Sequence, residues 1–178
     1  MPEKWRFLTK KKNHCMLKDI MRAARFLILS LLLMLPAATS AAESRYTDNY
    51  DGTIKDNLSE LVWIKDPDHT PGLAGAMVWN KAKHSCKDLV FGGYGPNVWY
   101  LPNIKELQGL VEESSGSPRI DTFHFSCTGE PYWSSTDDTG NGTRAWVVHF
   151  GSGELLSYPK LSLMNPIALR ARCVRRSQ

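Results

Sequence analysis

The residues best suited to chemistry in this sequence are Cys127 and two histidines, His124 and His149. A cysteine with a histidine as general base is a nucleophile pair, so Cys127 with His124 or His149 is one candidate catalytic arrangement. The spacing His124-x-x-Cys127 also offers two zinc ligands, but a structural zinc site needs four, and no second pair at ligand spacing follows. A histidine between Phe123 and Phe125 more often packs than binds metal. The sequence therefore predicts no metal and no cofactor, and a cysteine-dependent enzyme stays as the alternative to a non-catalytic protein.

Aromatic side chains in or beside the expected loops are the candidates for ligand binding. A tyrosine or tryptophan ring with one polar atom suits sugars and protein surfaces alike. These candidates are Tyr94, Trp99, Tyr100, Tyr132, Trp133 and Tyr158. Burial in the core is the competing interpretation, which we prefer for Trp63, Trp79 and Trp146. It is also the favoured interpretation for the Trp99-Tyr100 pair.

Arginines near the C-terminus are a second set of binding candidates. They are Arg170, Arg172, Arg175 and Arg176. Together they could form a basic edge for a polyanion, although alternate arginines on a half-exposed strand are usually only solvated. The whole chain carries +4, residues 1–42 account for +6, and residues 43–178 therefore carry −2. This charge gives no reason to expect nucleic-acid binding.

The first 42 residues differ in composition from the rest. A basic lead is followed by an apolar run over residues 26–35, by Pro36 and by small residues up to Ala42. This order is typical of a secretory signal peptide cleaved after Ala42, and a start at Met16 or Met21 would give it a more ordinary length. A membrane-spanning helix needs about 20 apolar residues, so we expect membrane contact only during export. The expected location is the periplasm or the cell exterior.

Residues 43–178 are enough for one domain with a single core. Apolar spacing predicts a helix over residues 79–89, with Cys86 on its buried face, and a second helix begins after Asn103, which forms a capping box with Glu106. The expected strands cover residues 46–48, 53–55, 61–64, 132–136, 144–150, 154–158 and 169–173, with one turn centred on Asn141-Gly142. Early helices and late strands are typical of an α+β fold.

Several ordered motifs in these elements resemble the Lcl C-terminal domain family, named for a bacterial collagen-like adhesin. They are Asp51-Gly52-Thr53-Ile54-Lys55-Asp56-Asn57, Leu61-Val62-Trp63, Trp79-x-x-Ala82-x-x-x-Cys86-x-x-Leu89, Gly92-Gly93-Tyr94, Trp99-Tyr100-Leu101-Pro102, Lys105-Glu106-Leu107, Tyr132-Trp133-Ser134-Ser135-Thr136, Ala145-Trp146-Val147-Val148-His149-Phe150 and Arg172-Cys173-Val174-Arg175. The resemblance spans residues 46–175. Two positions depart from the family pattern, because Tyr100 stands where the family usually has Arg, and Asn103 stands where it usually has Thr.

The resemblance implies a C-type-lectin-like fold, in a group that also contains formylglycine-generating enzymes. Such a fold has two short helices packed on a small, mostly antiparallel sheet with long loops. The named member of the family binds sulfated glycosaminoglycans, so the resemblance also implies a polyanionic ligand. The substitution of Tyr100 for Arg removes any ion pair or ligand contact that the family's Arg makes there.

Three cysteines follow the expected cleavage site: Cys86, Cys127 and Cys173. Export places them in an oxidising compartment, and three cysteines allow three single pairings with one thiol left over. Cys86 and Cys173 both fall on apolar positions of their elements. The resemblance to C-type-lectin-like folds implies a bond between the first helix and the last strand, so we predict a Cys86–Cys173 disulfide. Cys127 is then free or bonded to another chain.

We expect an exported bacterial binding or adhesion module without catalytic activity. Its expected partner is an extracellular or envelope ligand, either a carbohydrate such as a glycosaminoglycan or a protein. Two alternatives stay open: the Cys127 enzyme, and a structural envelope protein that binds only protein.

Overall fold

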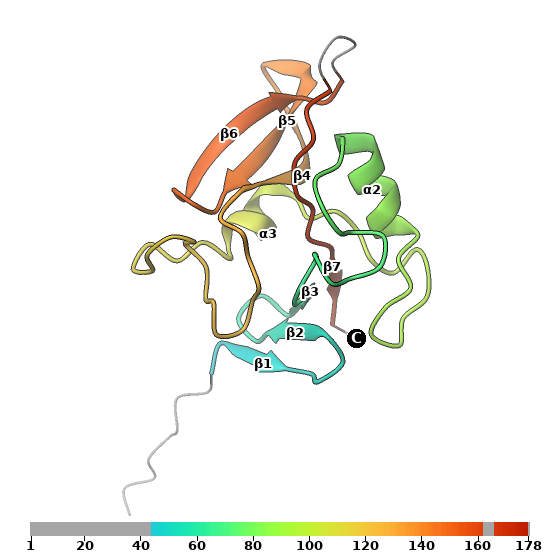
Figure 1. Cartoon of the computed structure of the whole chain (residues 1–178), viewed down its shortest axis with the longest axis vertical. Helices are drawn as coiled ribbons and strands as arrows, with labels where there is room; N and C mark the ends of the chain where they lie inside the picture. Colours follow the sequence, from blue (N-terminus) through green and yellow to red (C-terminus); the bar gives the residue numbers. More distant parts are fainter. Residues whose placement is uncertain (1–43, 162–165, 178) are drawn as a thin grey trace, which may run out of the picture. The chain divides into compact units, whose positions relative to one another are not determined.

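The computed structural model describes residues 44–161 and 166–177, which belong to the unit Glu43–Gln178. The expected signal peptide lies outside these residues. In chain order the elements are β1 (Tyr46–Asp48), β2 (Thr53–Asp56), β3 (Leu61–Ile64), α2 (Trp79–Lys87), α3 (Ile104–Gln108), β4 (Pro131–Asp138), β5 (Asn141–His149), β6 (Glu154–Pro159) and β7 (Val174–Arg176) (Figure 1). The predicted α+β class is confirmed.

The first sheet is antiparallel and has the strand order β1-β2-β3-β7. The predicted hairpin β1–β2 is present, and two residues of its turn, Tyr50 and Gly52, have φ angles of 59° and 87°. Gly52 is needed for space as well, because a Cβ atom there would lie 2.7 Å from the ring of Phe91. The Asp51 carboxylate accepts hydrogen bonds from the backbone N–H and the hydroxyl of Thr53, at 3.0 and 2.6 Å, which fixes the start of β2.

The second sheet is an antiparallel meander with the order β4-β5-β6. Its first turn lies at residues 139–140, where the Asp138 carboxylate accepts a hydrogen bond from the N–H of Gly140 at 3.1 Å. The predicted turn centre at Asn141-Gly142 is therefore wrong, because these residues already belong to β5. The strands thus form two sheets, where the resemblance implied one.

The predicted first helix is confirmed as α2, which ends two residues earlier than expected. Trp79, Ala82 and Cys86 form its buried face. The indole N–H of Trp79 donates to the backbone oxygen of Ser134 in β4, at 2.8 Å, so α2 is anchored to the second sheet. The predicted Cys86–Cys173 disulfide is also present and joins α2 to the residue before β7.

The chain before β7 differs from the expected strand over residues 169–173. Leu169 forms a single bridge with Met77, and Arg170 forms one with Tyr132 of β4, whereas Val174 pairs with β3 and with Tyr100. The C-terminal segment thus passes from the second sheet to the first, and it cannot keep the alternating exposure of one regular strand (Figure 1).

The second predicted helix, α3, has the predicted capping box. The Asn103 side chain accepts from the N–H of Glu106 at 2.9 Å, and the Glu106 carboxylate accepts from the N–H of Asn103 at 2.8 Å. These two bonds satisfy amide groups that have no partner within so short a helix.

We expect Asn103→Ala to lower the free energy of unfolding by about 1 kcal/mol, because the N–H of Glu106 loses its acceptor. Urea denaturation measures this change. Gln108→Ala is the matched control, since Gln108 is exposed at the other end of the same helix. A loss that is equal in both variants would contradict the capping role of Asn103.

The described core contains two clusters of buried side chains. One surrounds the disulfide and includes Trp79, Trp99 and Trp133; the other lies around Trp63 and Phe150. Core packing is thus confirmed for Trp63, Trp79 and Trp99. The side chain of Trp146, for which core packing was also predicted, is only half-buried.

Candidate functional site

Five of the predicted ligand-binding side chains lie in the core, with exposed fractions of 5% or less. They are Trp99, Tyr132, Trp133, Arg172 and Arg175. Burial agrees with the favoured interpretation of Trp99, which contributes only an edge to a surface cleft. For the other four it corrects the hypothesis that their rings and charges are available to a ligand at the surface. Large rings are buried here because a small domain with short elements needs them to fill its core. The other candidates, Tyr94, Tyr100, Tyr158 and Arg170, are half-buried, and Arg176 is exposed.

Arg172 is fully buried and acts as a structural cross-link. Its guanidinium donates hydrogen bonds to the backbone oxygens of Ile64, Lys65 and Ser126. It also lies 5.3 Å from the ring centroid of Phe125 and 5.7 Å from that of Tyr132. Three carbonyl groups and two aromatic faces therefore surround the charge in place of a solvated surface.

Arg175 is also held inside the domain. Its guanidinium carbon lies 3.5 Å from the ring centroid of Tyr94 and 5.7 Å from that of Trp99. One of its nitrogens donates to the backbone oxygen of Arg176 at 2.8 Å. The cation thus stacks on aromatic rings, which is a common environment for arginine in proteins.

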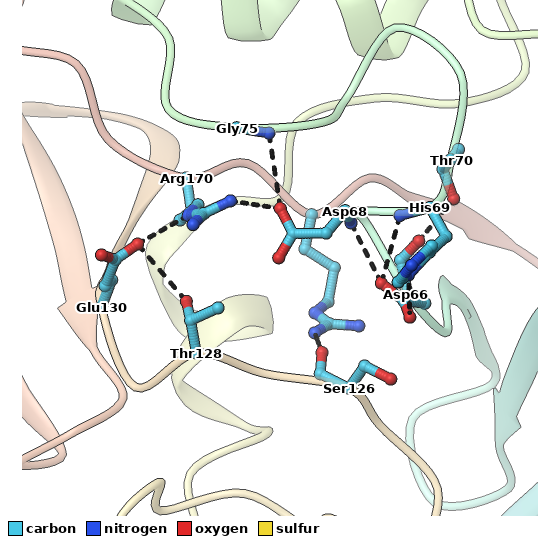
Figure 2. A network of polar contacts seen from close by, with 10 residues as sticks. Asp66, Asp68, His69, Thr70, Gly75, Ser126, Thr128, Glu130 and Arg170 are labelled. Atoms are coloured by element: carbon cyan, nitrogen blue, oxygen red, sulfur yellow. Dashed lines mark hydrogen bonds and ion pairs between the residues drawn. The ribbon is translucent and has the colours of Figure 1, made fainter.

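Arg170 connects two loops through ion pairs, as Figure 2 shows. It donates to the Glu130 carboxylate at 2.6 Å and to the Asp68 carboxylate. The hydrogen bond from Arg170 holds the pKa of Glu130 below its usual value, so this carboxylate stays charged. Of the four arginines, only Arg176 is exposed, so these side chains do not form the basic edge that was one hypothesis from the sequence, and Arg172 and Arg175 are not solvated either.

Cys127 is a half-buried free thiol, and both candidate bases have other partners. His124 donates from Nδ1 to the Asp121 carboxylate at 2.7 Å. The Nδ1 atom of His149 accepts from the N–H of Ser152 at 3.2 Å. Within residues 44–161 and 166–177, neither imidazole is hydrogen-bonded to the Cys127 sulfur, so the nucleophile–base pair of the alternative hypothesis is not assembled in this structure.

A candidate site is the cleft between α2 and the segment 97–101, which we call the cationic cleft. Its volume is about 570 Å³. Its lining comprises Asn80, Lys83, His84, Lys87, Asn97, Trp99, Tyr100, Leu101 and Ser135. Asn97 has a φ angle of 66°, and its N–H donates to the backbone oxygen of Lys87 at 2.6 Å. This hydrogen bond fixes the loop wall of the cleft against the end of α2.

The charged lining of the cationic cleft is entirely basic. Lys83, His84 and Lys87 lie on one exposed face of α2, and the lining contains no carboxylate. The Lys83 ammonium nitrogen lies 4.6 Å from the ring centroid of Trp79, which limits its range of positions. His84 donates from Nδ1 to the backbone oxygen of Asn80 at 2.7 Å, so its Nε2 donates to a ligand only in the protonated ring, and the donors that need no protonation are the two lysines and the amide and hydroxyl groups. The cleft can therefore donate several hydrogen bonds to an anion.

Sequence reasoning identified Trp99 and Tyr100 but missed the helical half of this site. The sequence did contain a pattern that points to this half of the site. Along the polar face of α2, the residues at helical spacing are basic or amide-bearing, and none is acidic: Asn80, Lys83, His84 and Lys87. Basic residues in a last helical turn also stabilise the helix itself, so their charge alone does not identify a site. What the sequence lacks is the concave surface, which appears only when segment 97–101 packs beside α2.

Comparison with known proteins supports the family resemblance found in the sequence. No curated protein matches the chain. The family model of the Lcl C-terminal domain matches residues 52–175, a range that includes α2, α3, Cys86, Cys173 and the whole lining of the cationic cleft. The chain therefore belongs to the Lcl C-terminal domain family.

Proposed function

We propose that this domain is a non-catalytic, exported binding module that holds an anionic group of an extracellular or envelope glycan in the cationic cleft. The observation that carries the proposal is the lining of this cleft, which combines three basic side chains with amide and hydroxyl donors and no carboxylate. Sulfate and carboxylate groups of glycans are the matching acceptors. The polyanionic ligand implied by the family resemblance has the same chemistry.

The size of the cleft fits a sugar-sized ligand. Sites for small ligands commonly have volumes of about 300–1,000 Å³, and the volume of about 570 Å³ lies within this range. Tyr100 and Leu101 add an aromatic and an apolar surface on which a sugar ring can rest. These surfaces would favour an anionic sugar over a small inorganic anion.

The proposed export is supported by the disulfide, because structural disulfides persist in oxidising compartments. In the part of the chain that the structure describes, none of the helices has the length and apolar character needed to cross a membrane. A periplasmic or secreted location remains part of the proposal.

Loss of a cleft lysine tests the site directly. We expect Lys83→Ala and Lys87→Ala each to weaken binding of a heparin oligosaccharide about fivefold, since each removes about 1 kcal/mol of charge-assisted hydrogen bonding. Isothermal titration calorimetry at low salt measures this change. Low salt matters because ionic screening weakens contacts between exposed charges.

Lys81→Ala is the matched control, because Lys81 is exposed on the same helix and does not line the cleft. The affinity of the Lys81→Ala variant for the heparin oligosaccharide should stay within about twofold of that of the parent protein. An equal loss in all three variants would show that net charge, rather than the cleft, governs binding. If the parent protein binds no anionic glycan but binds envelope protein, the structural alternative replaces this proposal.

A further inference from the structure

We infer that the cationic cleft binds its anion together with a proton, which His84 takes up, so that the ligand is held more tightly at mildly acidic pH than at neutral pH. This inference rests on the proposed function and adds a regulation of the same site. Lysine, amide and hydroxyl donors alone would give no such dependence, because their charge does not change between about pH 5 and pH 8.

The hydrogen bond of His84 determines which ring nitrogen carries the proton when the side chain is neutral. Nδ1 lies 2.7 Å from the backbone oxygen of Asn80, and a carbonyl oxygen can only accept. In the neutral ring the proton is therefore on Nδ1, and Nε2 carries a lone pair. A neutral His84 thus offers an anion no donor from Nε2, whereas the protonated ring offers a donor and a positive charge.

The two other cations of the cleft lie on either side of His84 along α2. Lys83 precedes it directly, Lys87 follows within the same turn, and both line the cleft. Asp88 is the C-cap residue of α2, and it does not line the cleft. The ion pairs of the described ranges include none between Asp88 and His84. A protonated His84 therefore has no carboxylate partner on its own helix, all of which the structure describes.

The walls that face α2 add no charge that changes near neutral pH. Tyr100 contributes a phenol, and burial raises the pKa of this group, so its hydroxyl stays neutral at mildly acidic and neutral pH. Asn97, Leu101 and Ser135 contribute amide, apolar and hydroxyl groups, which do not titrate. Among the described residues that line the cleft, His84 is therefore the group whose charge depends on pH near neutrality.

The other three histidines that the structure describes have different partners within the domain: His69, His124 and His149. The first two donate from Nδ1 to a carboxylate three positions earlier, so a charge on either ring is compensated within the domain. The Nδ1 atom of His149 accepts from a backbone N–H. His84 has a carbonyl group as its partner, and a bound anion would supply the opposite charge that favours the protonated ring.

Anion binding and protonation of His84 are linked in both directions. The anion favours the protonated ring, and the protonated ring binds the anion more tightly, because one interaction free energy enters both equilibria. A positive charge in the last turn of α2 is also favourable for the helix. Affinity therefore falls as the pH rises and His84 loses its proton, while the lysines keep their charge and retain part of the binding.

The test is calorimetry of the heparin oligosaccharide with the full domain at about pH 5.5 and about pH 7.5, at equal ionic strength. Sulfate groups stay ionised over this range, so the ligand itself does not titrate. The parent protein should bind about fivefold more tightly at the lower pH, a modest coupling because His84 is exposed. His84→Gln should bind with the weaker affinity at both pH values, and His84→Arg with the stronger affinity at both.

Proton uptake gives a second measurement of the same coupling. In buffers of different ionisation enthalpy at neutral pH, the parent protein should take up part of a proton for each ligand bound, and His84→Gln should take up none. His69→Gln is the matched control, because His69 is exposed, is paired with Asp66 and does not line the cleft. This variant should keep both the pH dependence and the proton uptake.

Two other results separate this inference from the proposed function. If the parent protein binds equally well at both pH values, or if His84→Gln keeps the pH dependence, the coupling to His84 is overturned, while the cationic cleft can still be the site. If the oligosaccharide binds at neither pH, the proposed function is overturned together with this inference. Thermal unfolding of each variant at both pH values confirms that the substitutions leave the domain folded.

Discussion

Replacing Cys86 and Cys173 together by alanine is expected to lower the free energy of unfolding by about 4–5 kcal/mol. The disulfide joins residues that are 87 positions apart, so without it the unfolded chain gains the freedom of a long loop. Natural domains are commonly stable by only about 5–15 kcal/mol, so the variant should lose a large part of its stability. Urea denaturation of the double variant, beside the parent protein, measures the difference.

Cys127→Ala is the control for this experiment, because Cys127 is the free cysteine of the described chain and is only half-buried. Its effect should stay below about 1 kcal/mol. Reduction of the parent protein should reproduce the effect of the double variant. A loss below about 1 kcal/mol in both reduced and substituted protein would show that the disulfide does not restrict the unfolded chain in the expected way.

Arg172→Met is expected to lower the free energy of unfolding by about 3–5 kcal/mol. Methionine has a similar length but no donor, so the backbone oxygens of Ile64, Lys65 and Ser126 lose the hydrogen bonds that Arg172 supplies. The Lys65 oxygen keeps the N–H of Ser126 as a donor, at 3.1 Å, so the main loss falls on the buried contact with Ile64 and on the contact with Ser126. A buried carbonyl without a donor costs about 1–3 kcal/mol when water cannot replace that donor. Hydrogen exchange should show earlier opening of the segment around Ser126, since one of the lost bonds holds it to the C-terminal segment.

Two further variants distinguish this role from a general effect of charge. Arg176→Met removes the same charge from an exposed position, and it should change the free energy of unfolding by less than about 0.5 kcal/mol. Arg172→Lys keeps the charge but replaces the planar guanidinium by a single ammonium group. Its free energy of unfolding should therefore lie between that of Arg172→Met and that of the parent protein. A neutral effect of Arg172→Met would contradict the cross-link.

The sequence predicted well the features that depend on residues close to one another in the chain. The α2 face with Trp79, Ala82 and Cys86 follows from helical spacing, and the Asn103–Glu106 capping box is a local signal of a helix start. The disulfide partner of Cys86 could not be predicted from residue types and spacing alone, because three cysteines allow several pairings. The family resemblance supplied the choice of Cys173.

Arg172 and the cationic cleft were missed because tertiary contacts decide both. Alternation along a strand places Arg172 at a half-exposed position, but the segment crosses between two sheets and turns this side chain inward. The cleft likewise depends on segment 97–101 lying beside α2. Neither relation is contained in the spacing of nearby residues.

The path of the C-terminal segment has a consequence for the timing of folding. Arg170 completes the edge of β4, and Val174 fills the position between β3 and Tyr100. Both sheets therefore need residues that follow all their other strands in the chain. Neither sheet can reach its final form before these residues have been synthesised. Folding of the two sheets is therefore coupled through one short segment, and a chain cut before Arg170 would leave both of them incomplete.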